Sequence, residues 1–295
     1  MRDTERDPLE AARALASELR QKAGTDLIPD LDKLEALLAD AAKPDAAVPE
    51  VAPDADMIPR QQLDDLVAEN AKFVSVMVHE IRVPMTSIRG YNDMLLKNVV
   101  GELNEMQQQF VEVIRSNVIR MEHLVTDVSD ASKLRSGRIR PEPKMDMYKN
   151  IALEVEKATT TLAEEHGHTL TFDTPQGLPI LNVDGPRLVQ ALTKLVINAL
   201  QYTPDGGQIT VRAENTGGQL KVSVQDSGIG MDDEEQTHIG ELFWRGESEH
   251  VRSFKGHGLG LPIAIGLVKL MGGEFSYETA PEQGSTFSIL LPPMS

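Results

Sequence analysis

The sequence predicts an α + α/β chain, in which a helical hairpin is followed by an α/β sandwich domain. Two observations predict this division. From residue 63 to residue 88, apolar or seam-compatible residues recur at alternating spacings of four and three, as a helical bundle requires. Beyond residue 145, helical stretches alternate with short period-two runs, which is typical of a sheet with helices on one face.

Composition narrows the classes of function. The formal net charge of -17 disfavours nucleic-acid binding and docking on anionic lipid, because both need basic patches. The absence of cysteine excludes disulfides and thiolate metal sites, and the seven histidines show no metal-ligand spacing along the sequence. There is no apolar run of membrane-span length and no signal-peptide core, so we expect a cytoplasmic protein without a membrane span.

Residues 1–58 are predicted to form an acidic helical segment that ends in a Pro/Ala linker. This segment is too small for an ordinary sensor domain. A docking hairpin for a sensor or another partner and a partly ordered tail both fit its sequence.

Residues 59–140 are predicted to form the hairpin, with helices over about 59–98 and 105–134 joined by a short turn. One apolar stripe consists of Leu63, Val67, Asn70, Val74, Met77, Ile81, Pro84 and Ile88, and the other of Phe110, Ile114, Asn117, Met121, Leu124, Val128 and Ala131. Because a lone hairpin cannot bury both stripes, we predict a homodimeric four-helix bundle through residues 60–135.

His79 follows the seam residue Met77 by two positions, so we expect it on the outward face of the first helix, beside Glu80. A lone surface histidine next to a glutamate is common and usually has no function. The alternative is an imidazole placed to react with another group, and motifs further along the chain decide between the two.

Residues 145–295 are predicted to form the α/β domain, with mostly antiparallel strands and helices on one face. Helices are expected near 147–165, 186–201 and 259–271. Strands are expected near 168–173, 179–183, 208–214, 219–225, 274–279 and 285–291.

Three motifs in this domain carry chemistry. Asn198 lies in an apolar helix, where its amide is either a satisfied core group or an oxygen ligand for magnesium. Asp226 follows a strand and precedes spaced glycines, so its carboxylate can accept a hydrogen bond from an exocyclic amine. The glycines at 256, 258 and 260 open a helix, where amide groups and the helix dipole attract phosphate.

In this order, the motifs resemble those of a bacterial sensor histidine protein kinase of the GHKL ATP-binding superfamily, over about residues 60–295. The matching segments are His79 to Pro84 for the phosphoacceptor box, Asn198 for the asparagine box, Asp226 to Gly230 for the adenine-binding glycine box, Glu241 to Arg245 for the phenylalanine box, Gly256 to Leu261 for the second glycine box, and Gly284 to Phe287 for the closing segment.

The resemblance implies a HisKA-type dimerisation hairpin, then a Bergerat-type ATP-binding domain at 145–295 with ATP and Mg²⁺ as cofactors. It implies autophosphorylation of His79, assisted by Glu80, and phosphotransfer to an aspartate in the receiver domain of a separate response regulator. Asn198 is the implied metal ligand. The implied ATP-binding residues are Asn198, Tyr202, Asp226, Gly228, Gly230, Phe243, Arg245, Arg252, Lys255, Gly256, Gly258, Leu259, Gly260, Leu261 and Thr286.

Three positions depart from the family pattern. Lys194 stands where an earlier asparagine is frequent, Gln201 where a lysine is common, and Val83 where relatives place a threonine or asparagine for phosphatase activity. Two other classes therefore stay open: a degenerate nucleotide-binding signalling module, and another GHKL ATPase.

Overall fold

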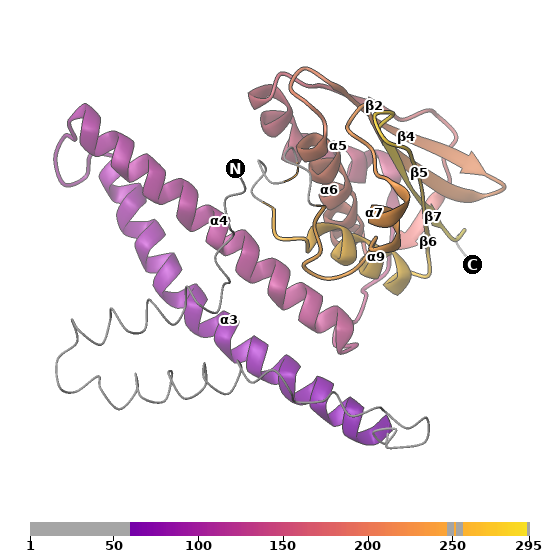
Figure 1. The fold of residues 1–295 in the computed structure, drawn as a ribbon, viewed down its shortest axis with the longest axis horizontal. Coiled ribbons are helices and arrows are strands. Elements are labelled where there is room, and N and C mark those ends of the chain that lie inside the picture. The colour runs from indigo at the N-terminus through magenta and orange to yellow at the C-terminus, as the bar shows by residue number, and fades with distance from the viewer. Residues whose placement is uncertain (1–59, 247–250, 252–255, 294–295) are drawn as a thin grey trace, which may run out of the picture. The chain divides into compact units, whose positions relative to one another are not determined.

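The computed structural model describes residues 60–246, 251 and 256–293. The prediction for residues 1–58 lies outside the described residues, and so do Arg252 and Lys255. Figure 1 shows two long helices that form a hairpin and a domain in which helices cover one face of a sheet. The predicted fold class is confirmed.

The hairpin consists of α3 (Arg60–Leu96) and α4 (Glu105–Arg135), and its boundaries lie within two residues of the predicted ones. α4 begins at a capping box, in which Asn104 Oδ1 accepts from the Gln107 amide at 2.9 Å and Gln107 Oε1 accepts from the Asn104 amide at 3.0 Å. Pro84 lies inside α3 and has no amide hydrogen, so the carbonyl of Glu80, beside His79, loses its helical donor.

The two helices of the hairpin meet through a stripe next to the predicted one. Ala71, Val78, Met85 and Asn92, each seven residues apart, are buried, and Asn92 Nδ2 donates to the Val111 carbonyl at 3.0 Å. The predicted stripes are open over most of their length, with exposed fractions of 37 to 61% at Met77, Ile81, Ile88, Phe110, Ile114 and Met121, whereas Leu124, Val128 and Ala131 pack with the core of the domain. The contact within the hairpin therefore leaves a long apolar face uncovered.

The domain contains a five-stranded sheet of order β2-β4-β5-β7-β6, in which β2 and β4 are parallel and the other pairs are antiparallel. Its strands are β2 (Thr169–Asp173), β4 (Gln208–Thr216), β5 (Gln219–Asp226), β6 (Glu274–Thr279) and β7 (Ser285–Leu291). The helices on its covered face are α5 (Tyr148–Glu165), α6 (Gly185–Tyr202) and α9 (Gly260–Leu270).

Two short elements were not predicted. Strand β1 (Lys144–Met147) pairs with β3 (Ile180–Val183) in a separate two-stranded sheet, so the predicted strand at 179–183 does not join the main sheet. Helix α7 (Asp233–Thr237) is five residues long and has no buried residue. Neither element is long enough to show a hydrophobic period.

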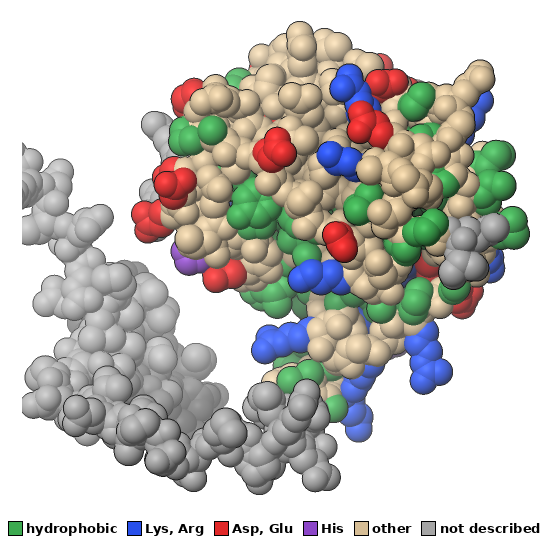
Figure 2. Space-filling view, turned by 90° about the vertical axis from the view of Figure 1, so that its right-hand side faces the viewer, with side chains coloured by type: hydrophobic (Ala, Val, Ile, Leu, Met, Phe, Trp, Pro, Cys, Tyr) green, Lys and Arg blue, Asp and Glu red, His purple; other side chains and the backbone are tan. Residues whose placement is uncertain are grey.

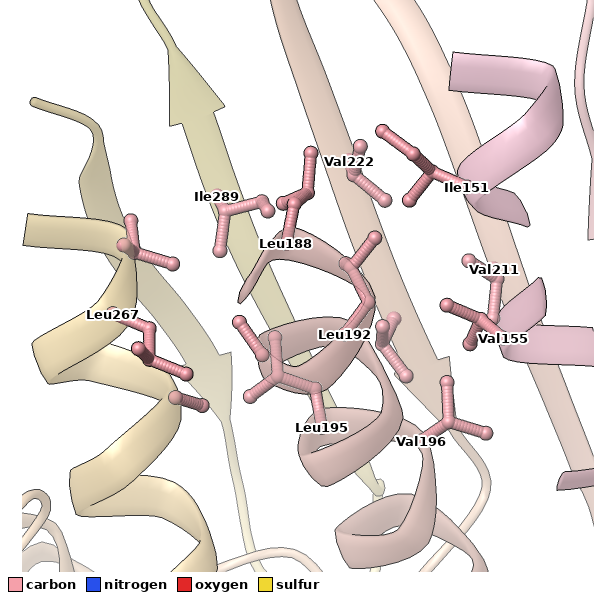
Figure 3. Close-up of a cluster of buried hydrophobic side chains, with 14 of the residues drawn as sticks. Ile151, Val155, Leu188, Leu192, Leu195, Val196, Val211, Val222, Leu267 and Ile289 are labelled. Carbon is pink, nitrogen blue, oxygen red and sulfur yellow. The ribbon is translucent and has the colours of Figure 1, made fainter. Parts of the chain in front are cut away.

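The core of the domain lies between the sheet and its helices (Figure 3). Leu188, Leu192 and Leu195 of α6 are completely buried, and they pack toward Val222 and Ile289 of the sheet. Burial alternates along β4 and β5, so each strand turns one face to the helices. This packing holds the carboxyl end of β5 and the face of α6 in fixed positions.

On the face drawn in Figure 2, lysine and arginine side chains are interspersed with acidic and hydrophobic ones. Among the described residues, no helix has both the length and the apolarity that crossing a bilayer requires.

Candidate functional site

A cavity of about 380 Å³ opens beside α6, the ends of β5 and β7, the start of α9 and one side of α4. This volume falls within the range of small-molecule and cofactor sites, roughly 300–1,000 Å³. Its lining brings together most of the predicted nucleotide-binding residues: Asn198, Tyr202, Asp226, Gly230, Arg245, Gly256, Gly258, Leu259, Gly260 and Leu261. Gly228, Phe243 and Thr286 lie outside the lining.

One face of α6 forms a polar wall of the cavity. Lys194, Asn198 and Gln201 follow one another at spacings of four and three, so they share one side of the helix, and all three line the cavity. Asn198 is half-buried, and its amide has no hydrogen bond to another described residue. A satisfied core asparagine would have such a bond. The amide is therefore open to a ligand, and its oxygen suits a hard cation such as Mg²⁺.

Asp226 is a buried carboxylate at the end of β5, with 6% of its surface exposed. Its Oδ1 accepts from the Gly228 amide at 2.8 Å and from the Ser285 amide at 3.0 Å. Burial raises the pKa of Asp226 to about 6, although both hydrogen bonds act to lower it. Because the two donors use Oδ1, Oδ2 is the oxygen left for a donor on a ligand, and such a donor would favour the ionised form.

Two glycines allow the backbone to approach closely around the cavity. Gly230 has a φ of +64°, and a Cβ there would collide with the Ala280 carbonyl. Gly258 has a φ of +66°, and a Cβ there would lie 2.6 Å from the carbonyl carbon of Phe243. Only glycine satisfies both the conformation and the space at these positions.

The first turn of α9 presents amide groups to the cavity. Its N-cap residue, Leu259, has no side chain that can cap the helix, and no capping hydrogen bond is present. The amides of Gly260 and Leu261 therefore have no helical acceptor, and both residues line the cavity. Uncapped amides and the helix dipole make this end of α9 suited to bind an anion such as phosphate.

Helix α4 supplies a wall that sequence reasoning did not anticipate. Arg120, His123 and Asp127 line the cavity, and Lys194 Nζ lies 2.6 and 2.7 Å from the two carboxylate oxygens of Asp127. Three residues further on, Asp130 Oδ2 accepts from Gln190 Nε2 at 2.6 Å. The helical period shows that Asp127 and Asp130 share a face, but it does not show which element that face meets.

Trp244 is one of three aromatic residues on the lining, together with Tyr202 and Phe287. Its ring stacks on His238 with centroids 5.0 Å apart and an angle of 14° between the planes, and both residues line the cavity. Phe243, the aromatic that the sequence pattern favours, has a positive φ and is 62% exposed. A positive φ turns this residue away from the course of its neighbours, which the sequence does not reveal.

The predicted phosphoacceptor is on another part of the fold. His79 and Glu80 are both exposed on α3, and neither lines the cavity. Their exposure agrees with the predicted outward position of His79. In this structure the imidazole of His79 is therefore not at the cavity.

Comparison with protein families identifies both parts. A family described as "Histidine kinase-, DNA gyrase B-, and HSP90-like ATPase" matches residues 183–295, which include the cavity motifs. The "His Kinase A (phospho-acceptor) domain" family matches residues 69–137, which include His79. The fold and the site thus define an ATP-binding domain joined to a phosphoacceptor hairpin, and the two matches together cover more than half of the chain.

Individual relatives agree with the two family matches. The chain is 32% identical to the sensor protein DivL of Caulobacter vibrioides over 220 residues, which are 75% of this chain and 28% of that protein. It is 29% identical to the histidine protein kinase DivJ of the same organism over 233 residues, which are 79% of this chain and 39% of DivJ. The crystal structure of full-length ShkA in complex with AMPPNP matches with a TM-score of 0.63 and 25% identity, over 75% of this chain and 45% of ShkA.

The chain belongs to the sensor histidine kinase family. It spans less than half the length of the curated relatives that it matches.

Proposed function

We propose that this chain is an ATP-dependent protein-histidine kinase of a two-component system. It phosphorylates its own His79 and passes the phosphoryl group to an aspartate in the receiver domain of a separate response regulator. The observation that carries the proposal is a cavity that joins Asn198, Asp226 and the uncapped amides of α9, in a chain that also presents His79 uncovered on a helix. ATP is the donor, so the proposal places the reaction in the cytoplasm.

Each group in the cavity has a role that its chemistry supports. Asp226 accepts a hydrogen bond from the adenine amino group. The amides of Gly260 and Leu261 bind phosphate oxygens, with Lys194 as a nearby cation. Asn198 holds Mg²⁺, which when bound neutralises charge on the phosphates.

The transfer step needs little covalent chemistry from the protein. A ring nitrogen of neutral His79 attacks the γ-phosphorus with its lone pair. The nitrogen–phosphorus bond forms as the bond to the bridging oxygen of ADP breaks. The other ring nitrogen then gives its proton to Glu80, which leaves a neutral imidazole ring bearing the anionic phosphoryl group.

Transfer also requires movement, because His79 does not line the cavity. The ion pair between Lys194 and Asp127 joins α6 to α4, so it must open if the ATP-binding domain moves along the hairpin. The exposed apolar face of the hairpin supports a homodimer through residues 60–135, in which the phosphoacceptor lies in the same chain or its partner.

The test is incubation with γ-labelled ATP, comparing the wild-type chain with His79→Gln. We expect the wild type to acquire acid-labile, base-stable phosphate and the variant to acquire none, while both bind ATP. His123→Gln is the matched control, because His123 is a helical histidine that lines the cavity. Full labelling of His79→Gln would move the acceptor elsewhere, and a wild type that binds ATP without labelling would favour the degenerate signalling module.

A further inference from the structure

We propose that His166, His168 and Asp205 form a binding site for a borderline transition-metal ion such as Zn²⁺, separate from the nucleotide cavity. The three residues contribute one ligand atom each, and these atoms all lie within 4.8 Å of one another. Among the described residues, no other group of three or more histidines and carboxylates meets this condition. None of the three lines the nucleotide cavity.

The three ligands come from two loops that are far apart in the sequence, so the sequence alone does not indicate the site. His166 and His168 flank the turn between α5 and β2, while Asp205 lies in the loop between α6 and β4. A backbone hydrogen bond from the Gly206 amide to the His166 carbonyl, at 3.1 Å, ties the two loops together, and a second runs from the Thr169 amide to the Gly207 carbonyl at 2.9 Å. The scaffold is therefore held by the backbone, independently of any ion.

His168 is oriented as a metal ligand would be. It is 8% exposed, and its Nε2 lies 3.2 Å from the Leu200 carbonyl, which can only accept. Nε2 therefore carries the hydrogen, and Nδ1 keeps a lone pair. That Nδ1 is buried without a hydrogen-bond partner. A ligating histidine usually donates its other ring N–H to a carbonyl or carboxylate in this way.

The rings of His166 and His168 are stacked, with centroids 5.7 Å apart and 20° between their planes. The two imidazoles therefore lie side by side, as ligands of one ion would.

Asp205 completes the donor set. Its Oδ1 lies 3.0 Å from His166 Nδ1, and its side chain is 79% exposed, so it can rotate toward an ion. Metal–ligand bonds of about 2.0–2.1 Å in a tetrahedral site put ligand atoms about 3.3 Å apart, so small side-chain rotations suffice. Two nitrogens and one oxygen suit Zn²⁺, Co²⁺ or Ni²⁺ better than Mg²⁺, and they leave a fourth position for water.

A simple ion pair between His166 and Asp205 is the competing explanation, and the chain contains a matched control for it. His238 Nδ1 lies 2.9 Å from Glu241 Oε2, and His238 is exposed to almost the same degree as His166, at 37% against 36%. Within the part of the chain that the structure describes, this second pair has no third ligand that completes a metal-binding group. If histidine–carboxylate pairs bound metal by themselves, both would do so.

The experiment is calorimetric titration of Zn²⁺ into the tag-free, full-length chain after treatment with a chelator, without nucleotide and with excess Mg²⁺. We expect one saturable Zn²⁺ site. His166→Gln and Asp205→Asn should each weaken it by at least about tenfold, and His238→Gln should leave it unchanged. Co²⁺ in the wild type should give the visible absorption of a tetrahedral site, which the two variants lose.

His168→Gln is a third variant, but it alters a buried residue, so its fold must be verified by circular dichroism. The two surface variants keep the test decisive if His168→Gln unfolds. The proposal is overturned if the wild type shows no saturable site, or if His166→Gln and Asp205→Asn bind Zn²⁺ as the wild type does. The readout needs no kinase activity, so it is independent of the proposed function.

Discussion

The ATP-binding domain and the hairpin bury their apolar residues in different ways. In the domain, Leu188, Leu192 and Leu195 of α6 are 0% exposed, and the core is complete within one chain. In the hairpin, several large apolar residues on the predicted stripes remain between 37 and 61% exposed. The core of the domain, to which Ala131 of α4 contributes, is thus closed within one chain, whereas the rest of the hairpin has an apolar face whose burial needs another surface.

This difference assigns different roles to the two regions. A complete core positions Asn198, Asp226 and the α9 amides before any ligand arrives, which reduces the entropy cost of binding. A hairpin that is complete only with a partner makes the presentation of His79 depend on assembly. Substitutions in the hairpin and in the ATP-binding domain test this contrast separately.

Ile114→Glu should break the dimer. Ile114 is 47% exposed on the open stripe of α4, so a charge there would be buried in a four-helix bundle. Hot-spot substitutions of this kind cost about 2–4 kcal/mol, roughly a thirtyfold or greater loss of dimer affinity. Sedimentation over a concentration series measures it. Val99→Glu, in the exposed turn between the helices, is the control and should leave the mass unchanged.

A substitution in the core of the ATP-binding domain tests the other side of the comparison. Leu192→Ala removes a fully buried side chain from α6, and it should lower the stability of the domain by about 2–5 kcal/mol at every protein concentration. A wild-type chain that sediments as a monomer at all concentrations would refute the proposed dimer. It would also refute the claim that the hairpin buries its apolar face against a second copy.

Asp226→Asn should weaken nucleotide binding by about 1.5–3 kcal/mol, because the charge-assisted hydrogen bond to adenine is lost. Without nucleotide its effect has the opposite sign. The folded-state pKa of about 6 lies above the ordinary value of 3.8, so the stability this carboxyl contributes is full below pH 3.8 and is lost as pH rises through about 6.

The asparagine variant should therefore lack this loss, which amounts to about 3 kcal/mol. Thermal melts of the nucleotide-free chain at pH 4 and pH 7.5 measure it, and calorimetry with an ATP analogue measures affinity. Unchanged affinity would remove Asp226 from adenine recognition, whatever the melts show.

The long, periodic elements were predictable from the sequence, and the short or tertiary features were not. Helices α3, α4, α5 and α6 begin and end within two residues of their predicted bounds, because each carries several turns of hydrophobic period. Strand β1 has only four residues and gains its partner from β3, 33 or more positions away. No local pattern specifies such a pairing.

The cavity shows the same limit. The glycine and asparagine motifs indicated the α6 and α9 walls, because local sequence positions those groups. The α4 wall depends on how two helices from different parts of the chain meet, as in the Lys194–Asp127 pair across 67 residues. Asp205 joins His166 across 39 residues, which is why the histidine spacing alone predicted no metal site.

Asp127→Asn should strengthen binding of an ATP analogue by about 0.5–1 kcal/mol. The substitution removes a carboxylate from the cavity wall and releases Lys194 for phosphate. The matched control is Asp130→Asn, one helical turn away, which removes the charge of the carboxylate that accepts from Gln190 but does not line the cavity. Calorimetry compares the two, and weaker binding by Asp127→Asn would show that the ion pair supports the site instead of competing for its lysine.

Val83→Thr should have the smallest effect on the kinase and should act only on a later step. Val83 follows His79 by one helical turn and is 56% exposed, so it lies on the surface that a phosphorylated regulator would meet. Its side chain has no donor or acceptor and cannot orient a water molecule. The hydroxyls of Thr86 and Ser87 do not compensate, because Thr86 Oγ1 donates to the Arg82 carbonyl at 2.9 Å and Ser87 Oγ donates to the Val83 carbonyl at 3.3 Å.

We therefore expect weak or absent phosphatase activity in the wild type, and faster decay of regulator phosphate with Val83→Thr. Autophosphorylation should stay the same, because the proposed step uses His79 and Glu80 and not the residue at 83. Decay of labelled regulator with Mg-ADP and each variant measures the effect, with Thr86→Val as a control that removes a hydroxyl already bound to the backbone. Rapid loss of regulator phosphate with the wild-type chain would show that a side chain at another position orients the water.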